Sequence, residues 1–413
     1  MFYRNQITER EFASLVSIAV LCFMLTYLSA SKIFPVSANP IDKGVLAVDD
    51  DGKVAAVYTA EEAAELNIRP DRVYEGILVP GFVNTHCHLE LSHLKGQIPE
   101  HTGLLQFVGQ VMKTRAADKS AIQKAMNAAD REMYENGIVA IGDISNVAAS
   151  KQTKLDSALY YQTFIEALGF NPEKAADIFA QAMALQHEFQ PLPASVVPHA
   201  PYSVSDPLMQ LISEQAVLDG QPISMHNQET AAENEFFLKK TGGFLDLYAF
   251  LGLNLDFYQA PGVSSLQATL PKLPDSRVLL VHNTQTIRAD VEFAQAQNKD
   301  VFWCLCPNAN LYIENQLPDV EMLEEAGLRI TLGTDSLASN HQLSILKEMQ
   351  TLQLHKQVGL DTLLQWATLN GAAFLGIDDQ YGSLEAGKKP GIILLEHVKE
   401  NTITDQTTIT RLY

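Results

Sequence analysis

Short runs of apolar, β-branched and aromatic residues alternate with longer amphipathic runs between about residues 81 and 380. Each short run ends in polar residues, as a strand does where it reaches a loop. Strands that alternate with helices are typical of parallel sheets, and eight of them predict an α/β fold with a closed (β/α)8 TIM-like barrel. The eight predicted strands are 81–88, 137–145, 159–167, 194–200, 222–227, 277–283, 301–307 and 329–335.

The segments between these strands predict helices. Ser205 or Asp206 is a suitable N-cap for one of them, and Gly220 is a suitable stop. Residues 241–276 lack clear periodicity, which predicts an excursion of loop and helix near the site. The three most helix-like segments are 119–137, 171–189 and 205–220.

Strand-like sequence also flanks the barrel, at about residues 25–80 and 381–413. Neither stretch has enough apolar residues for a core of its own. We therefore expect both to form one composite β-sandwich, with residues 81–380 as the barrel domain.

The first 23 residues precede this organisation. Residues 12–25 form a nearly unbroken apolar run of 14 residues, which is short for a membrane span. A secretory signal cleaved near Ser29 or Ala30 would cut the first predicted strand, whereas Met24 is a natural start just before it. We expect residues 1–23 to be an upstream extension without a structural role. The alternatives for these residues are a secretory signal or membrane anchor, and an ordered helix.

Composition excludes some classes of protein. Hydrophobic residues make up 46% of the 413 residues and charged residues 19%, which argues against disorder. Acidic residues outnumber basic ones by 49 to 29, with no Lys/Arg run, so we expect no nucleic-acid partner and no membrane partner for the mature domain. Four scattered cysteines favour a reducing, cytoplasmic location. A homodimer stays open.

Metal-binding side chains stand at the ends of the predicted strands. His86 and His88 are two residues apart on one strand, so their side chains project from the same face. The carboxyl ends of barrel strands converge on one point, and these donors therefore predict a metal site there. The other donors at strand ends are His199, His226, His282 and Asp335.

Several motifs resemble one known family. The sequence is similar to the amidohydrolase superfamily, in its branch of cytosine, guanine and adenosine-type deaminases and chlorohydrolases, with a slight similarity to aminofutalosine deaminases. The resemblance spans about residues 25–395. It rests on the segments GFVNTHCHLELS, PHAPYSVS, MHNQE, VHN, GTDSLASN and ATLNGAAFLGIDDQYGSLEAGKK.

The resemblance implies one divalent metal per chain, held by His86, His88, His226 and Asp335. Zinc is the expected ion and iron the alternative. Members of the family with two metals have a lysine or another bridging ligand at the end of the fourth strand. His199 stands there instead. The resemblance therefore implies a mononuclear site, with His199 turned toward the substrate.

The chemistry of the residues agrees with these roles. Asp335 can both bind a metal and accept a proton from water. Glu229, three residues beyond His226, can carry a proton to a ring nitrogen, although a solvated acid at a helix start is the alternative. His282 can polarise the developing tetrahedral centre, unless it is an ordinary core histidine.

Two further residues are candidates for substrate binding beside His199. Glu90 follows the paired histidines and either lines the pocket or has a structural role. Asn310 follows the seventh strand, in a turn that resembles the family's Cys-Pro-x-Ser-Asn sequence, but Ala309 replaces the serine. That departure puts any substrate contact through a serine in doubt.

We therefore predict a metal-dependent aminohydrolase that replaces an amino group on a heteroaromatic ring by water. Expected small-molecule substrates are purine-nucleoside-like, such as aminofutalosine or adenosine derivatives, or guanine and cytosine. The alternative is a chlorohydrolase or cyclic amidohydrolase with the same metal site. A non-catalytic binding relative is a more distant alternative.

Overall fold

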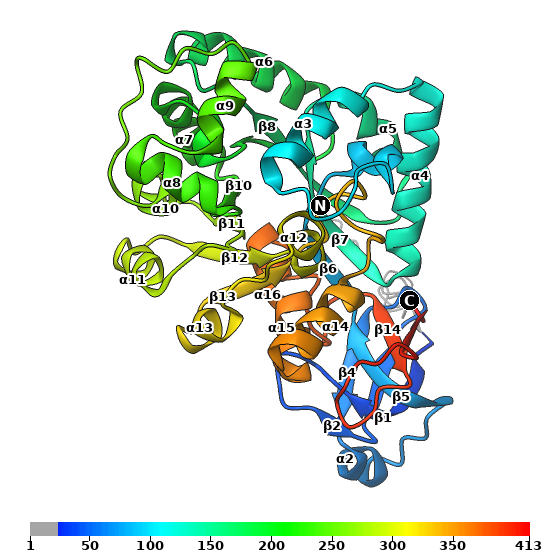
Figure 1. Ribbon diagram of the computed structural model, residues 1–413. Helices are drawn as coiled ribbons and strands as arrows, with labels where there is room; N and C mark the ends of the chain where they lie inside the picture. The colour runs from blue at the N-terminus through cyan, green and yellow to red at the C-terminus, as the bar shows by residue number, and fades with distance from the viewer. Residues whose placement is uncertain (1–23) are drawn as a thin grey trace, which may run out of the picture.

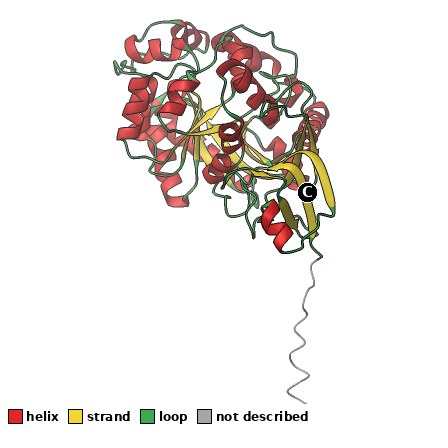
Figure 2. Cartoon of the chain, turned by 90° about the horizontal axis from the view of Figure 1, so that it is seen from below, coloured by secondary structure: helices red, strands yellow, loops and turns green. Residues whose placement is uncertain are grey.

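The computed structural model describes residues 24–413 (Figure 1). The predictions for residues 1–23 lie outside this range. Among the described residues, no helix is long and apolar enough to cross a membrane. Figure 2 shows helices gathered around the strands, with a sheet built from the chain ends at one side.

Each of the eight predicted parallel strands is present. They form two four-stranded parallel sheets, in the orders β6-β7-β8-β9 and β10-β11-β12-β13. The strands are rich in buried apolar residues, as parallel strands covered on both faces require. Their bounds are β6 (Phe82–Cys87), β7 (Ile138–Ser145), β8 (Tyr160–Ala167), β9 (Ala194–Pro198), β10 (Ile223–Asn227), β11 (Val278–His282), β12 (Val301–Leu305) and β13 (Arg329–Leu332).

Backbone contacts join the two sheets at both of their edges. The amide of His226 on β10 donates to the carbonyl of His199, which follows β9, at 2.9 Å. At the other edge the amide of Thr334 donates to the carbonyl of His86 at 3.0 Å. An α/β fold with parallel sheets is therefore confirmed, while the closed barrel stays a prediction.

Helices follow most of the strands, as predicted. Helix α4 illustrates the local signals that form such a helix. Asp118 caps its start, and Met126, Ala129 and Met133 form one buried face. Helix α7 follows Ser205 and stops at Gly220, whose φ of 62° is left-handed. The helices are α2 (Ala60–Glu65), α3 (Leu104–Thr114), α4 (Lys119–Glu135), α5 (Lys151–Asp156), α6 (Ala175–Glu188), α7 (Asp206–Asp219), α8 (Ala231–Lys239), α9 (Gly243–Phe250), α10 (Ser265–Thr269), α11 (Arg288–Ala296), α12 (Pro307–Glu314), α13 (Val320–Glu325), α14 (Ile345–Lys356), α15 (Leu360–Ala367) and α16 (Leu369–Leu375).

The two ends of the chain share a third sheet, seen where blue and red strands meet in Figure 1. Its order is β15-β14-β5-β1-β3-β4, with β2 paired to β1, and β14 runs antiparallel to β5. The described pairing is one continuous sheet, so the two-layered sandwich and its domain boundaries stay predictions. The strands are β1 (Thr26–Ile33), β2 (Ile41–Asp42), β3 (Val45–Val48), β4 (Val54–Tyr58), β5 (Arg72–Pro80), β14 (Ile392–Glu396) and β15 (Thr408–Arg411).

Candidate active site

Three of the predicted metal ligands meet at the carboxyl ends of β6 and β13. His86 lies on β6, and His88 follows the strand by one residue, so both imidazoles point to one side. Their Nε2 atoms are 3.2 Å apart. Oδ1 of Asp335 lies 3.6 Å from Nε2 of His86 and 3.4 Å from Nε2 of His88. The fold therefore brings residues 86, 88 and 335 within reach of one ion.

His226, on β10, completes this group. Its ligand atom lies within 4.8 Å of those of His86 and His88. Nδ1 of His226 is 2.8 Å from the carbonyl oxygen of His199 and must be the donor, since a carbonyl only accepts. Nε2 is therefore the atom left to face the cluster, and the carbonyl fixes the orientation of the ring.

The spacing of these donors fits a tetrahedral metal. Ligand atoms about 2.1 Å from a metal at the corners of a tetrahedron are roughly 3.4 Å apart. The three separations among residues 86, 88 and 335 are 3.2, 3.4 and 3.6 Å. Three imidazoles and one carboxylate suit zinc and iron alike. The donor set therefore fits one divalent ion.

A second triad of donors overlaps the first. Glu166, His199 and His226 also have ligand atoms within 4.8 Å of one another. Oε1 of Glu166 is 3.5 Å from Nδ1 of His226. That nitrogen carries the proton donated to the carbonyl of His199, and a protonated nitrogen cannot bind a metal. The second triad is therefore a poor metal site while this hydrogen bond stands.

Burial favours the neutral form of two of the imidazoles, the state in which a histidine binds a metal. Burial lowers the pKa of His88 to about 4 and holds that of His226 well below its usual value. Burial alone would raise the pKa of Asp335. The polar contact with His86 and the facing imidazoles outweigh this effect of burial, and they hold the pKa of Asp335 well below its usual range. Burial would likewise lower the pKa of His86, but the facing carboxylate of Asp335 raises it. The site thus places imidazole nitrogens against one charged carboxylate.

Glu229 lies in the loop after β10 and is only 4% exposed. The structure therefore contradicts the alternative of a solvated acid. Its Oε1 is 3.7 Å from Nε2 of His282. Burial, with the charge of Asp335 added, raises the pKa of Glu229 well above its usual value. Burial thus favours the protonated form of this carboxyl group, which is the form that can donate a proton.

His282 ends β11 and is 1% exposed. Burial lowers its pKa to about 4. Its φ is 77° and that of Asp335 is 54°, and a left-handed backbone at such residues costs about 1–3 kcal/mol. Strain of this kind is typical of functional positions, which favours a role in chemistry over an ordinary core histidine.

A cavity of about 290 Å³ opens onto these groups. His199 is on its wall, and its Nδ1 lies 2.6 Å from the hydroxyl of Ser203. The strand ends contribute the polar residues, and α3 with its neighbours contributes an apolar side. The lining residues with polar side chains are His88, Arg115, Asn146, Glu166, His199, Tyr202, His226, Glu229, His282, Asp335 and Ser336.

Two predicted substrate contacts lie behind the cavity wall rather than on it. The carboxylate of Glu90 accepts hydrogen bonds from Arg115 at 3.0 Å and from the amide of Asn146 at 3.0 Å, and both partners line the cavity. Oδ1 of Asn310 lies 3.4 Å from Nδ1 of His282. Each residue thus supports a lining residue, and direct contact with substrate stays a prediction.

Sequence reasoning missed two lining residues that carry charge. Glu166 is the next-to-last residue of β8, and its Oε1 is buried without a hydrogen-bond partner among the described residues. The position of Glu166 near the carboxyl end of a predicted strand is the feature of the sequence that could have identified it as a cavity residue. Arg115 follows α3, and no periodicity marks it as a cavity residue.

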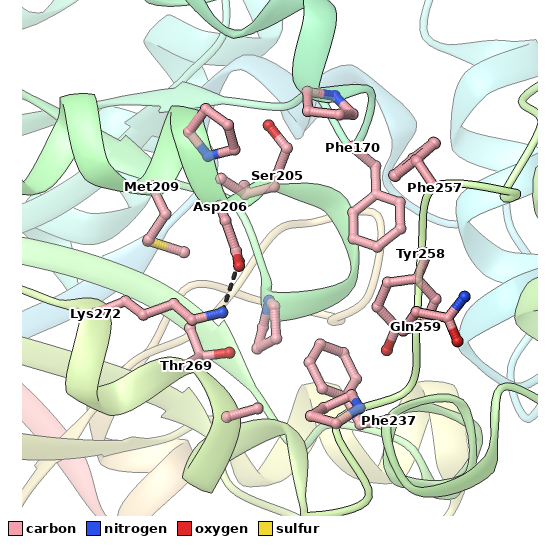
Figure 3. A pocket seen from close by; sticks show the side chains of 16 residues that line it. Phe170, Ser205, Asp206, Met209, Phe237, Phe257, Tyr258, Gln259, Thr269 and Lys272 are labelled. Atoms are coloured by element: carbon pink, nitrogen blue, oxygen red, sulfur yellow. Dashed lines mark hydrogen bonds and ion pairs between the residues drawn. The ribbon is translucent and has the colours of Figure 1, made fainter.

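A larger cavity of about 410 Å³ is lined in part by Pro201, the first residue of the 3₁₀ turn Pro201–Ser203. Figure 3 shows this cavity from close by. Phe170, Phe237, Phe257 and Tyr258 surround it, and its ion pair joins Asp206 to Lys272. None of the candidate metal ligands or catalytic residues lines it. The smaller cavity is therefore the candidate active site.

Comparison with known proteins agrees with this geometry. Residues 77–411 match the model of the Amidohydrolase family. The chain belongs to the amidohydrolase family, and the predicted family is confirmed.

The relatives include deaminases. An adenosine deaminase of Helicobacter pylori is 28% identical over 320 residues, covering 76% of this chain and 77% of the relative. An aminodeoxyfutalosine deaminase of Nitratiruptor sp. is 26% identical over 368 residues, covering 85% and 87%.

Solved structures show the same fold. The structure of Helicobacter pylori aminofutalosine deaminase with methylthio-coformycin matches with a TM-score of 0.76 and 24% identity, covering 92% of this chain and 93% of that one. The zinc complex of an atrazine chlorohydrolase from Arthrobacter aurescens matches with a TM-score of 0.69 and 16% identity, covering 89% and 86%.

Proposed function

We propose that this protein is a metal-dependent aminohydrolase that deaminates an adenosine-like heteroaromatic ring and releases ammonia. The observation that carries the proposal is the buried carboxyl group of Glu229, which lines the same cavity as the metal-ligand candidates. Deamination of a ring needs a proton donor beside the activated water.

His86, His88, His226 and Asp335 would hold one divalent metal. When bound, such a metal lowers the pKa of a coordinated water to about 7, which supplies hydroxide at neutral pH. Zinc is the proposed ion, because zinc complexes occur among the structural neighbours, and iron is the alternative.

The other residues move and hold protons. Glu229 donates its proton to a ring nitrogen as water adds to the neighbouring carbon, and Asp335 accepts the proton of the attacking water. That proton then passes to the amino group, which leaves as ammonia. The remaining hydroxyl proton is released as the carbonyl forms, and Glu229 regains a proton from the solution. His282, whose Nε2 is 3.7 Å from Oε1 of Glu229, is placed to hydrogen-bond the tetrahedral centre.

The relatives support the class of substrate. Besides the two deaminases compared above, a 5′-deoxyadenosine deaminase of Methanococcus vannielii is 28% identical over 354 residues. All three names describe deaminases, and two of them name an adenosine as the compound that is deaminated. Guanine and cytosine remain secondary candidates, and a chlorohydrolase or cyclic amidohydrolase is the alternative, favoured only by the fold shared with the atrazine chlorohydrolase.

The proposal extends to the architecture and setting. Backbone hydrogen bonds join the two parallel sheets at both of their edges, which supports closure of the sheets into one eight-stranded barrel. The strand ends would then face one active-site mouth, as in barrel enzymes generally. We propose a small-molecule substrate and a cytoplasmic location, with a homodimer as the assembly to test.

An ammonia-release screen tests the function. The metal-replete protein is assayed against adenosine, 5′-substituted adenosines, guanine and cytosine, with 6-chloropurine riboside as the test of dehalogenation. The proposal expects ammonia from an adenosine-type compound. Chloride release without ammonia from any amino compound would favour the chlorohydrolase.

A further inference from the structure

A buried ion pair that the mechanism above does not use lies beside the candidate metal site. Asp143 is on β7, where it is paired with Cys87, the residue between the two histidines of β6 and its end. Nζ of Lys154, on α5, is 2.7 Å from Oδ2 of Asp143, and both side chains are 0% exposed. Replacing a buried ion pair by apolar side chains of similar volume is often neutral or stabilising, so stability alone does not account for this pair.

The ammonium group of Lys154 has a partner for each of its three protons. Besides binding Asp143, it donates to Oγ of Ser145 at 3.1 Å and to Oγ1 of Thr163 at 3.0 Å. The ring centre of Phe189 lies 4.9 Å from Nζ, within the range of a cation–π contact. The ammonium group is therefore fixed, and it fixes the orientation of the Asp143 carboxylate.

The other oxygen of Asp143 binds the backbone next to His88. Its Oδ1 accepts a hydrogen bond from the amide of Leu89 at 2.7 Å. The torsion angle ψ of His88 sets the direction of that amide, and it is 79°, with φ at −123°. This conformation lies between the main helical and extended regions, so local backbone preference does not select it. The hydrogen bond from Leu89 to Asp143 therefore fixes the backbone of a metal-ligand candidate.

The ring of His88 depends on this backbone more than the ring of His226 does. Nδ1 of His226 donates to the carbonyl of His199, which orients that ring directly. In the described part of the chain, the polar contacts of the His88 ring run from Nε2 to His86 and Asp335, and none runs from Nδ1. A shift of the backbone at His88 would therefore move its Nε2 away from the other ligand atoms.

We propose that Asp143 and Lys154 are positioning residues of the metal site, in which the ion pair directs one carboxylate oxygen onto the amide of Leu89 and thereby holds His88 in its ligand orientation. The inference rests on the metal site of the proposed function and on no property of the substrate. Residues that orient metal ligands without touching the metal typically contribute about 10- to 100-fold to metal affinity. The effect of this pair is therefore measurable in metal binding itself.

Two double variants separate the hydrogen bond from the charges. Asp143→Leu/Lys154→Met removes both charges and the acceptor, and leucine branches at the same atom as aspartate. Asp143→Asn/Lys154→Met removes both charges but keeps an oxygen that can accept from the amide of Leu89. Phe189→Leu is the control, because it loosens the buried packing around Lys154 and leaves the hydrogen bond from Leu89 to Asp143 in place.

Metal binding is measured on each protein under conditions in which it is fully folded. Affinity for zinc is obtained by competition with a chromophoric chelator, and the visible spectrum of the cobalt(II)-substituted protein reports the geometry of the ligands. A loss of global stability alone changes neither property in the folded protein. The two measurements therefore separate positioning of His88 from a purely structural role of the ion pair.

Asp143→Leu/Lys154→Met should bind zinc at least about tenfold more weakly than the wild type, and the bands of its cobalt spectrum should shift. Asp143→Asn/Lys154→Met should keep the zinc affinity within about threefold and the wild-type cobalt spectrum, because the acceptor remains. Phe189→Leu should lower the melting temperature and change neither property. Unchanged zinc affinity in the leucine variant, or an equal loss in the asparagine variant or in Phe189→Leu, would overturn the proposal.

Further outcomes keep this inference apart from the proposed function. If Asp143→Leu/Lys154→Met does not fold, Asp143→Ser/Lys154→Met takes its place, because the shorter serine side chain cannot reach the amide of Leu89; unchanged zinc affinity in it would also overturn the proposal. Zinc affinity that depends on the acceptor at Asp143, without ammonia release from any substrate, would sustain this inference and refute the deaminase. Ammonia release by the wild type, with equal zinc affinity in all variants, would do the reverse. A wild type that binds no divalent metal would refute both.

Discussion

Replacement of Glu229 by glutamine separates proton transfer from every other role of this residue. The amide has nearly the same volume as the carboxyl group, which is buried and has a pKa raised well above its usual value in the wild type. Burial disfavours a charge at this position, so a neutral amide is tolerated there, and we expect the free energy of unfolding to change by less than about 1 kcal/mol. Because Glu229 is not among the predicted metal ligands, the variant should keep its metal.

Turnover should fall strongly. An amide can donate a hydrogen bond to the ring nitrogen but cannot transfer a proton, and loss of a general acid typically costs about 10²- to 10⁴-fold in rate. At roughly 1.36 kcal/mol per factor of ten, this corresponds to about 2.7 to 5.4 kcal/mol of activation free energy. Substrate affinity should be unchanged or tighter, because the missing interaction belongs to the transition state.

The assay is ammonia release at saturating substrate, with metal content and melting temperature measured on the same preparation. Glu235→Gln is the control, since Glu235 is exposed on α8 and lies outside the cavity wall. Turnover within about twofold of wild type in a metal-replete Glu229→Gln protein would refute the mechanism. Loss of metal together with activity would instead place Glu229 among the ligands.

Three further predictions follow from the site and the fold. The purified protein should contain about one zinc or iron per chain, and His88→Ala or Asp335→Ala should lose both the metal and the activity by elemental analysis and ammonia release; two metals per chain would contradict the mononuclear site. A chain that begins at Met24 should keep full activity and melting temperature, and aggregation or loss of metal would show that the preceding residues belong to the fold. Burial raises the pKa of Glu348 from 4.5 to about 8, so the folded protein binds this proton more tightly than the unfolded chain does. The stabilisation is complete below about pH 4.5 and is lost as the pH rises through 8. Glu348→Gln should therefore reduce the decline in the free energy of unfolding between pH 5 and 8, measured by urea titration, and an unchanged decline would count against this assignment.

The sequence predicted the parallel strands because their apolar runs are short, repeated and bounded by polar residues. It also predicted His86, His226 and Asp335 as neighbours, because the carboxyl ends of parallel strands converge whatever the intervening sequence. These residues did not need to be close along the chain. Their convergence follows from the topology alone.

Other features depend on contacts that no local pattern encodes. Arg115 reaches the cavity only because Glu90 and His93 tie the end of α3 back to the segment after His88. Glu90 itself was placed on the pocket wall by its proximity in sequence to the histidines. It lies behind the wall because the backbone amides of residues 146 and 147 occupy its second oxygen.

The pairing of the chain ends shows the same limit. Apolar composition indicated that residues 25–80 and 381–413 must share a core, but not how their strands pair. The structure places β1 parallel to β5 and antiparallel to β3, in one sheet. Register between strands so distant in sequence is set by the packed face as a whole.

The most direct test of the account is ammonia release from an adenosine-type nucleoside before and after removal of the metal. The account predicts ammonia and the hydroxypurine product in equal amounts from the metal-replete protein, loss of both after chelation, and recovery when one equivalent of zinc or iron is restored. Undiminished ammonia release from the fully chelated protein, or none from the metal-replete protein with any aminopurine nucleoside, would contradict it.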